Sequence, residues 1–143
     1  MKPEDCAYLA GVIDGEGCIL IGKSIAKASP CGFNYRVIVE ITMCEYDTIK
    51  YIHSIFCTRN MGIRTLRSGK TAYKTVWTNV HAAEIINLIL PYLRGKRKQA
   101  IVALEFQKIA PGRGREYTQE FLIKAEELRT KIKWLKTAEA LRC

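Results

Sequence analysis

The most informative part of this sequence is the stretch Leu9-Ala10-Gly11-Val12-Ile13-Asp14-Gly15-Glu16-Gly17. We expect it to continue a helix that starts near Pro3, because proline is tolerated in a first helical turn and the acids that follow suit its positive end. From residue 7 to residue 13 this helix carries no charged side chain. Such a pattern predicts a helix that is buried on all sides.

One face of the predicted helix is nearly bare backbone, because Ala7, Gly11 and Gly15 recur every four residues. A glycine inside a helix costs about 1 kcal/mol relative to alanine, so another interaction must compensate for it. Small residues let a second helix approach closely. We therefore expect the large side chains to face the core and the small face to contact another helix.

Two carboxylates lie where this helix is expected to end, at Gly15 and Gly17. Asp14 and Glu16 would then sit beside free carbonyl groups at the negative end of the helix dipole, where carboxylates are unfavourable. A hard divalent cation with oxygen ligands would neutralise them. The alternative is a buried helix closed by a glycine cap, with both acids in solvent.

The composition predicts one domain over residues 1–143 and a polyanionic partner. Apolar residues make up 48% of the chain, enough for a core, and the formal net charge is +9. The excess is concentrated in residues 51–100, which hold nine basic side chains and one acidic one. Nucleic acid is the polyanion that this pattern favours. A basic protein of the membrane surface is the alternative, although no single basic amphipathic helix dominates.

Six cysteines occur without a C-x-x-C pair, and the two histidines are remote from them in sequence, which argues against a zinc site. Several lie among apolar neighbours, as expected for reduced thiols. The sequence shows no signal peptide, membrane-spanning run or low-complexity segment. We expect a cytoplasmic protein, or one associated with an organelle or nucleoid, with no secretion signal.

Strand patterns follow the first helix in two pairs. The first pair covers residues 18–24 and 34–42 around a loop at 25–32, and the second covers residues 61–67 and 72–78 around a turn at 68–70. Residues 34–42 alternate between apolar and polar side chains, with Ile38 as the exception. The polar face is either an ordinary solvated face or a surface that reads base edges, since arginine suits guanine, asparagine adenine and glutamate cytosine. The candidate DNA-binding residues are Ser24, Lys27, Asn34, Arg36, Glu40, Arg64, Arg67, Lys70 and Lys74.

Helices are predicted at residues 45–57, from a cap at Asn79 to Ile89, from Arg94 to about Ala110, and from Thr118 onward. The third of these begins with four cations at residues 94–98, where the helix dipole repels positive charge. A phosphate or carboxylate partner would explain them; a solvated basic turn is the alternative.

The motif at residues 9–17 resembles the one that names the LAGLIDADG homing endonucleases, with Val12 for leucine, Gly15 for alanine and Glu16 for the second aspartate. The resemblance covers most of residues 8–106. It includes a second similar stretch, made of Pro91-Tyr92-Leu93, Lys96 and Gln99-Ala100. It implies an α+β fold of order αββαββα, with a four-stranded antiparallel DNA-binding saddle and an extra C-terminal helix.

By the same resemblance, Glu16 is a catalytic residue that binds a divalent cation with help from the Gly15 carbonyl, and Lys96 is a catalytic cation near the scissile phosphates. The cofactor would be Mg²⁺ or another divalent cation such as Mn²⁺. Met43 and Asp47 stand where some relatives carry polar or basic helper groups. One motif copy implies a homodimer. Its interface would include Ala7, Ala10, Gly11, Asp14 and Gly15.

The resemblance thus implies an intron-encoded homing endonuclease that hydrolyses both strands of a long, near-palindromic double-stranded DNA site and leaves staggered ends. The alternative within the fold is a non-cleaving RNA maturase or DNA-binding regulator. A purely structural basic dimer would leave the Asp14–Glu16 pair unexplained.

Overall fold

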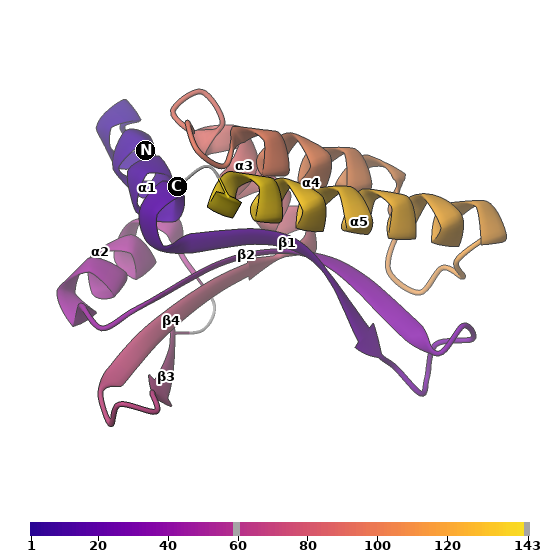
Figure 1. Cartoon of the computed structure of the whole chain (residues 1–143), viewed down its shortest axis with the longest axis horizontal. Coiled ribbons are helices and arrows are strands. Elements are labelled where there is room, and N and C mark those ends of the chain that lie inside the picture. Colours follow the sequence, from indigo (N-terminus) through magenta and orange to yellow (C-terminus); the bar gives the residue numbers. More distant parts are fainter. Residues whose placement is uncertain (59–60, 142–143) are drawn as a thin grey trace.

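The computed structural model describes residues 1–58 and 61–141, and their side chains as far as residue 138 (Figure 1). The elements are α1 (Pro3–Glu16), β1 (Gly17–Ile25), β2 (Phe33–Met43), α2 (Tyr46–Phe56), β3 (Met61–Thr65), β4 (Thr71–Thr78), α3 (Asn79–Ile89), α4 (Arg97–Ile109) and α5 (Gln119–Leu141). The predicted α+β order is confirmed. None of the described helices is long and apolar enough to span a membrane.

The strands form one antiparallel sheet in the order β1-β2-β4-β3. Figure 1 shows all the helices on one side of this sheet, and the two hairpins bending away from them as two arms. The face opposite the helices is therefore open and concave. It has the shape expected for the predicted saddle.

The core lies between the sheet and the helices. Strand β2 contributes alternate side chains to it, because Val37, Val39 and Ile41 are fully buried and their neighbours are not. Helix α1 contributes Leu9 and Ile13 from the opposite side. Alternation with a period of two is what a sheet with one covered face requires.

Helix α1 is not buried on all sides, so that expectation is wrong for the single chain. Ala7, Gly11 and Gly15 are exposed, and a Cβ added to either glycine would meet no atom within 4 Å. Ala10 belongs to the other face: it is fully buried in the subunit core, so its side chain is not part of the exposed surface. No described residue of the subunit therefore fills the space over the bare face.

Helix α1 passes directly into β1, with Glu16 as the last helical residue and Gly17 as the first strand residue. Gly15 therefore lies inside the last turn and does not end the helix as expected. Gly17 does end it: its N–H bonds to the Ile13 carbonyl, and a Cβ there would lie 2.6 Å from the Ile13 Cα. Only glycine fits at such a close approach of two backbone segments.

The second hairpin turns at residues 66–70, where the Leu66 N–H donates to the Lys70 carbonyl and Gly69 has φ +81°. Helix α3 differs from its prediction at the start. Asn79 is its first residue, with φ +52°, and Thr78 precedes it without a side-chain cap. Asparagine tolerates this left-handed conformation better than most residues, so it serves the bend here, not the cap. The cysteines at 6, 18, 31, 44 and 57 are free, and Cys143 lies outside the described residues.

Candidate nucleic-acid interface and metal site

The strand register places most candidate DNA-binding residues on the concave face. Residues directly opposite each other in an antiparallel pair share a face. Because the apolar side chains of β2 point to the helices, Asn34, Arg36 and Glu40 point away from them. Ser24 lies opposite Asn34, Lys74 opposite Thr42 on the same face, and Arg64 opposite Ala72. The tertiary structure therefore brings together residues that span fifty positions of sequence.

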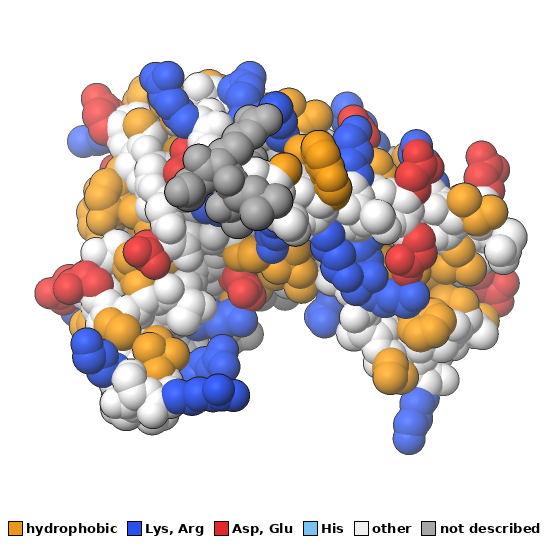
Figure 2. Space-filling view, in the orientation of Figure 1, with side chains coloured by type: hydrophobic (Ala, Val, Ile, Leu, Met, Phe, Trp, Pro, Cys, Tyr) orange, Lys and Arg blue, Asp and Glu red, His pale blue; other side chains and the backbone are white. Residues whose placement is uncertain are grey.

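Further candidate cations stand at the ends of the two arms. Lys27 is exposed in the turn between β1 and β2, and Arg67 and Lys70 are exposed in the turn between β3 and β4. Figure 2 shows lysine and arginine side chains at the lower end of each arm, on either side of a hollow under the sheet. Positive charge at both ends of a concave surface suits an elongated polyanion.

Glu40 and Lys74 form an ion pair across β2 and β4, with 2.8 Å between Lys74 Nζ and Glu40 Oε2. Both side chains are partly exposed on the concave face. Each therefore already has a partner in the free chain. Their direct contact with bases or phosphates stays a prediction.

An open pocket of about 1240 Å³ lies at the end of the first arm, which is the β1–β2 hairpin. Asn34 and Arg36 line one side of it, and Arg113 and Arg115, from the loop between α4 and α5, line another. Asn79 at the start of α3 completes it. The two loop arginines were not among the predicted site residues, because nothing in the local pattern of this Gly-rich loop indicates that it lies near β2. Two cations in a short Gly-rich loop were the available signal.

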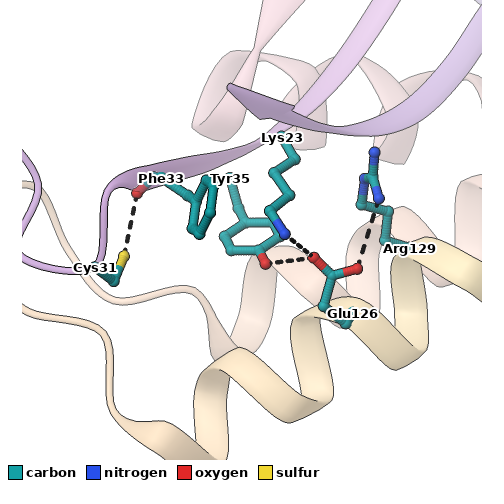
Figure 3. A network of polar contacts seen from close by, with 6 residues as sticks. All are labelled: Lys23, Cys31, Phe33, Tyr35, Glu126 and Arg129. Carbon is teal, nitrogen blue, oxygen red and sulfur yellow. Dashed lines mark hydrogen bonds and ion pairs between the residues drawn. The ribbon is translucent and has the colours of Figure 1, made fainter. Parts of the chain in front are cut away.

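The first arm is fastened to α5 by a polar network on the helix side of the sheet (Figure 3). Lys23 Nζ lies 2.7 Å from Glu126 Oε1, and the Tyr35 hydroxyl donates to the same oxygen at 2.6 Å. The bond from Lys23, followed by that from Tyr35, lowers the pKa of the Glu126 carboxyl. The bond with Glu126 also raises the pKa of Lys23. Lys23 is thus committed to the subunit and does not extend the basic concave face.

Asp14 is satisfied inside the subunit. Its Oδ2 accepts the Arg94 N–H at 2.8 Å and its Oδ1 accepts the Lys96 N–H at 2.9 Å. The Lys96 side chain donates from Nζ to the Asp14 backbone carbonyl at 2.6 Å, at the negative end of α1. Asp14 therefore accepts backbone N–H groups of the basic segment, and the Lys96 side chain complements the dipole of α1. A phosphate or carboxylate partner for the cationic side chains of this segment stays a prediction. The Asp14 side chain holds the start of α4 against the end of α1.

Glu16 is the carboxylate that remains. It is exposed, and it makes no hydrogen bond or ion pair within the described part of the chain. It stands one residue after Gly15, at the end of a helix whose carbonyls converge there. No group of three or more His, Cys, Asp or Glu residues is assembled among the described residues of one chain. An unneutralised carboxylate at a negative helix end nevertheless fits a cation ligand, and a second copy would supply further oxygens.

Met43 and Asp47, which stand where polar or basic helper groups were considered, lie in β2 and α2. Met43 is partly buried and packs against the core, and its position in β2 gives it the same face as Ile41. Asp47 is exposed in the first turn of α2. Met43 therefore does not face the concave surface.

The sequence profile of the LAGLIDADG endonuclease family matches residues 9–109, and the chain belongs to this family. The matched stretch holds one copy of the motif, at residues 9–17. No curated protein sequence matches the chain.

Solved structures share the fold at low sequence identity. The homing endonuclease I-CvuI, in complex with the I-CreI target in the presence of Mg, is 22% identical with a TM-score of 0.77, over 94% of this chain and 85% of that one. The archaeal intron-encoded homing endonuclease I-Vdi141I, complexed with DNA, is 14% identical with a TM-score of 0.75, over 92% of this chain and 84% of that one. I-SmaMI, bound to cleaved DNA, is 18% identical with a TM-score of 0.71, over 96% of this chain and 47% of that one.

Proposed function

We propose that this chain is a metal-dependent homing endonuclease that acts as a homodimer on double-stranded DNA. The observation that carries the proposal is Glu16, a carboxylate without a partner in the described chain, at the end of α1. It is joined directly to the first strand of a concave, positively charged face. A metal ligand and a DNA-binding surface therefore share one rigid junction.

The exposed face of α1 supports the homodimer. Gly11 and Gly15 leave space that no atom of the described residues enters, although two helical glycines cost about 2 kcal/mol together. Close pairing with the same face of a second α1 would compensate for that cost. It would also bring two Glu16 carboxylates and two Gly15 carbonyls to one axis.

At that axis the residues have separable roles. Glu16 binds and orients a divalent cation, Mg²⁺ or Mn²⁺, together with the Gly15 carbonyl. When bound, such a cation activates water and neutralises charge on a phosphate. Lys96, held 2.6 Å from the Asp14 carbonyl, places its ammonium group beside this position and stabilises the charge that builds up during hydrolysis.

The length of the strands on the concave face predicts the length of the DNA site. A strand of about ten residues spans roughly 33 Å, which corresponds to about ten base pairs. Two subunits related by a two-fold axis would cover a long, near-palindromic site. Cleavage of each strand near the axis would leave staggered ends. Arg113 and Arg115 join the predicted residues as candidate phosphate contacts at the outer end of each half.

Cleavage of a plasmid library tests the proposal. The purified chain is incubated with supercoiled plasmids that carry randomised inserts, with Mg²⁺ or with EDTA, and linear products are sequenced. We expect linear product with staggered ends in the reactions with Mg²⁺, and no linear product in the reactions with EDTA. Glu16→Gln removes the charge and keeps the shape of the side chain, so DNA binding should persist while cleavage is lost. Wild-type cleavage by Glu16→Gln would refute the metal assignment, and binding without cleavage by the wild-type chain would favour the regulator or maturase alternative.

A further inference from the structure

The concave face carries a small apolar patch in the middle of its polar and charged side chains. Leu20 lies directly opposite Ile38, and Ile38 lies opposite Thr78, so these three share one row across the sheet. Val76 lies in the next row, opposite Glu40. We call Leu20, Ile38 and Val76 the apolar patch.

The apolar patch does not belong to the hydrophobic core. All three side chains are partly exposed, and none is part of the buried cluster or among the half-buried residues that pack against it. Ile38 breaks the alternation of apolar and polar residues in β2, but it obeys the alternation of faces, since its neighbours Val37 and Val39 are buried on the helix side. Figure 2 shows hydrophobic side chains at the roof of the hollow beneath the sheet.

Ile38 is held in place by a glycine. Its Cδ1 lies 2.8 Å from the position that a Cβ on Gly22 would occupy, so the side chain leans over the bare backbone of β1. Gly22 is itself opposite Arg36. The apolar patch is therefore bounded by a cation on one side and by the Glu40–Lys74 ion pair on the other.

The charges around the apolar patch indicate what covers it. A polyanion is attracted by the cations at both ends of the concave face, and the groups that DNA presents to a sheet in its major groove are base edges. Of these, the apolar one is the C5-methyl group of thymine. We propose, resting on the DNA-binding function above, that Leu20 and Ile38 determine specificity by contacting thymine methyl groups, so that each half-site requires thymine there.

The position of this thymine follows from the strand geometry. Leu20 is four residues along β1 from Glu16. At about 3.3 Å per residue, this distance is about 13 Å, or roughly four base pairs from the metal-binding end of α1. Arg36, in the adjacent outer row, would read the base pairs beyond it.

Selection followed by methyl deletion tests the proposal. The full chain is used to select bound duplexes from a randomised pool, and each thymine of the preferred site is then replaced by deoxyuridine, which lacks only the methyl group. We expect a loss of affinity of about three- to five-fold at one or two thymines in each half-site, about four base pairs from the centre, and none elsewhere. In Ile38→Ala and Leu20→Ala this loss should disappear. In Gly22→Ala, which displaces Ile38, it should shrink.

Ile63→Ala is the matched control, because Ile63 is an exposed isoleucine whose partner Tyr73 packs on the helix side of the sheet. It should leave the deoxyuridine pattern unchanged. Since the methyl deletion is made in the DNA, the result does not depend on whether a variant folds. If selection enriches a preferred site but deoxyuridine weakens binding at none of its thymines, the thymine-methyl proposal is refuted and the DNA-binding function stands. A pool with no enriched sequence would overturn the DNA-binding function as well.

Discussion

At the level of single residues, the two acids of the motif differ in whether their carboxylates have a hydrogen-bond partner within the described chain. Asp14 accepts two backbone N–H groups from the start of α4, whereas Glu16 is exposed and has no partner in the described chain. The first is therefore an internal brace, and the second is free to bind a ligand. Sequence spacing cannot separate these roles, because the donors to Asp14 come from residues eighty positions away.

Lys96 has both a structural and a proposed catalytic contact, and Lys96→Met separates them. Loss of its bond to the Asp14 carbonyl should lower stability by about 0.3–1 kcal/mol. Loss of the cation beside the reacting phosphate should lower the single-turnover cleavage rate by about 10²-fold or more, with little change in affinity. Both are measurable on one cognate duplex with parallel thermal unfolding.

Lys70→Met is the control for that experiment, since Lys70 is exposed in the β3–β4 turn. It should weaken binding and leave the rate of the bound complex unchanged. If both variants lose affinity alone, Lys96 is an ordinary phosphate contact.

Glu126 gives a pH-dependent prediction. Its bonds with Lys23 and Tyr35 lower the pKa of its carboxyl in the folded state. Its contribution to stability is therefore full above the unfolded pKa of about 4.3 and is lost as pH falls through the lowered folded value. Glu126→Gln should be less stable than wild type at neutral pH, and the difference in melting temperature should shrink below about pH 4. A difference that stays constant down to acid denaturation would contradict the role of this ion pair.

At the scale of elements, helix α1 is half core and half exposed surface. Gly11→Leu tests that division, because a Cβ at this position would meet no atom of the described residues within 4 Å. The subunit should stay folded, and helix propensity alone favours leucine over glycine by about 1 kcal/mol. Close packing with a second α1 should be blocked, so sedimentation should report a monomer and cleavage should be lost.

Thr130→Leu is the control, since it adds similar bulk to an exposed position of α5. It should leave the sedimentation of the wild type unchanged. A dimer in Gly11→Leu would show that the exposed face of α1 is not the interface.

Sequence periodicity predicted the elements well because each one buries a single face. The alternation in residues 34–42 and the turn near Gly69 both follow from local chemistry. The small residues at 7, 11 and 15 indicated the exposed face of α1, but the burial of Ala10 on the other face could not be predicted, because an apolar helix looks the same whether its cover is its own subunit or another one. The approach of Arg113 and Arg115 to Asn34 was also missed, because it depends on how two loops meet in space.

At the scale of the whole molecule, charge is distributed by face as well as by sequence. The concave face and its two arms carry Arg36, Arg64, Arg67, Lys70 and Lys74, whereas Lys23 is turned to α5 and paired with Glu126. Net charge alone does not distinguish these cations. Their positions determine which of them can meet a phosphate.

Salt dependence tests this distribution. If the chain neutralises about six or more phosphates, affinity for DNA should fall about 10³-fold between about 50 and 200 mM salt. Arg67→Met should reduce the slope of log affinity against log salt by about one phosphate equivalent. Lys23→Met should leave that slope unchanged, because its charge is already paired. A flat response of the wild type would exclude nucleic acid as the partner.

The direct passage of α1 into β1 at Glu16 and Gly17 has a consequence for how such a protein changes its target. In the proposed dimer, the separation of the two strand breaks depends on how the paired helices sit, while the preferred bases depend on side chains further along the strands. A lineage can therefore exchange the concave residues and acquire a new target while its overhang length stays the same. Ends made at an old site and at a new one would then differ in sequence, but not in length.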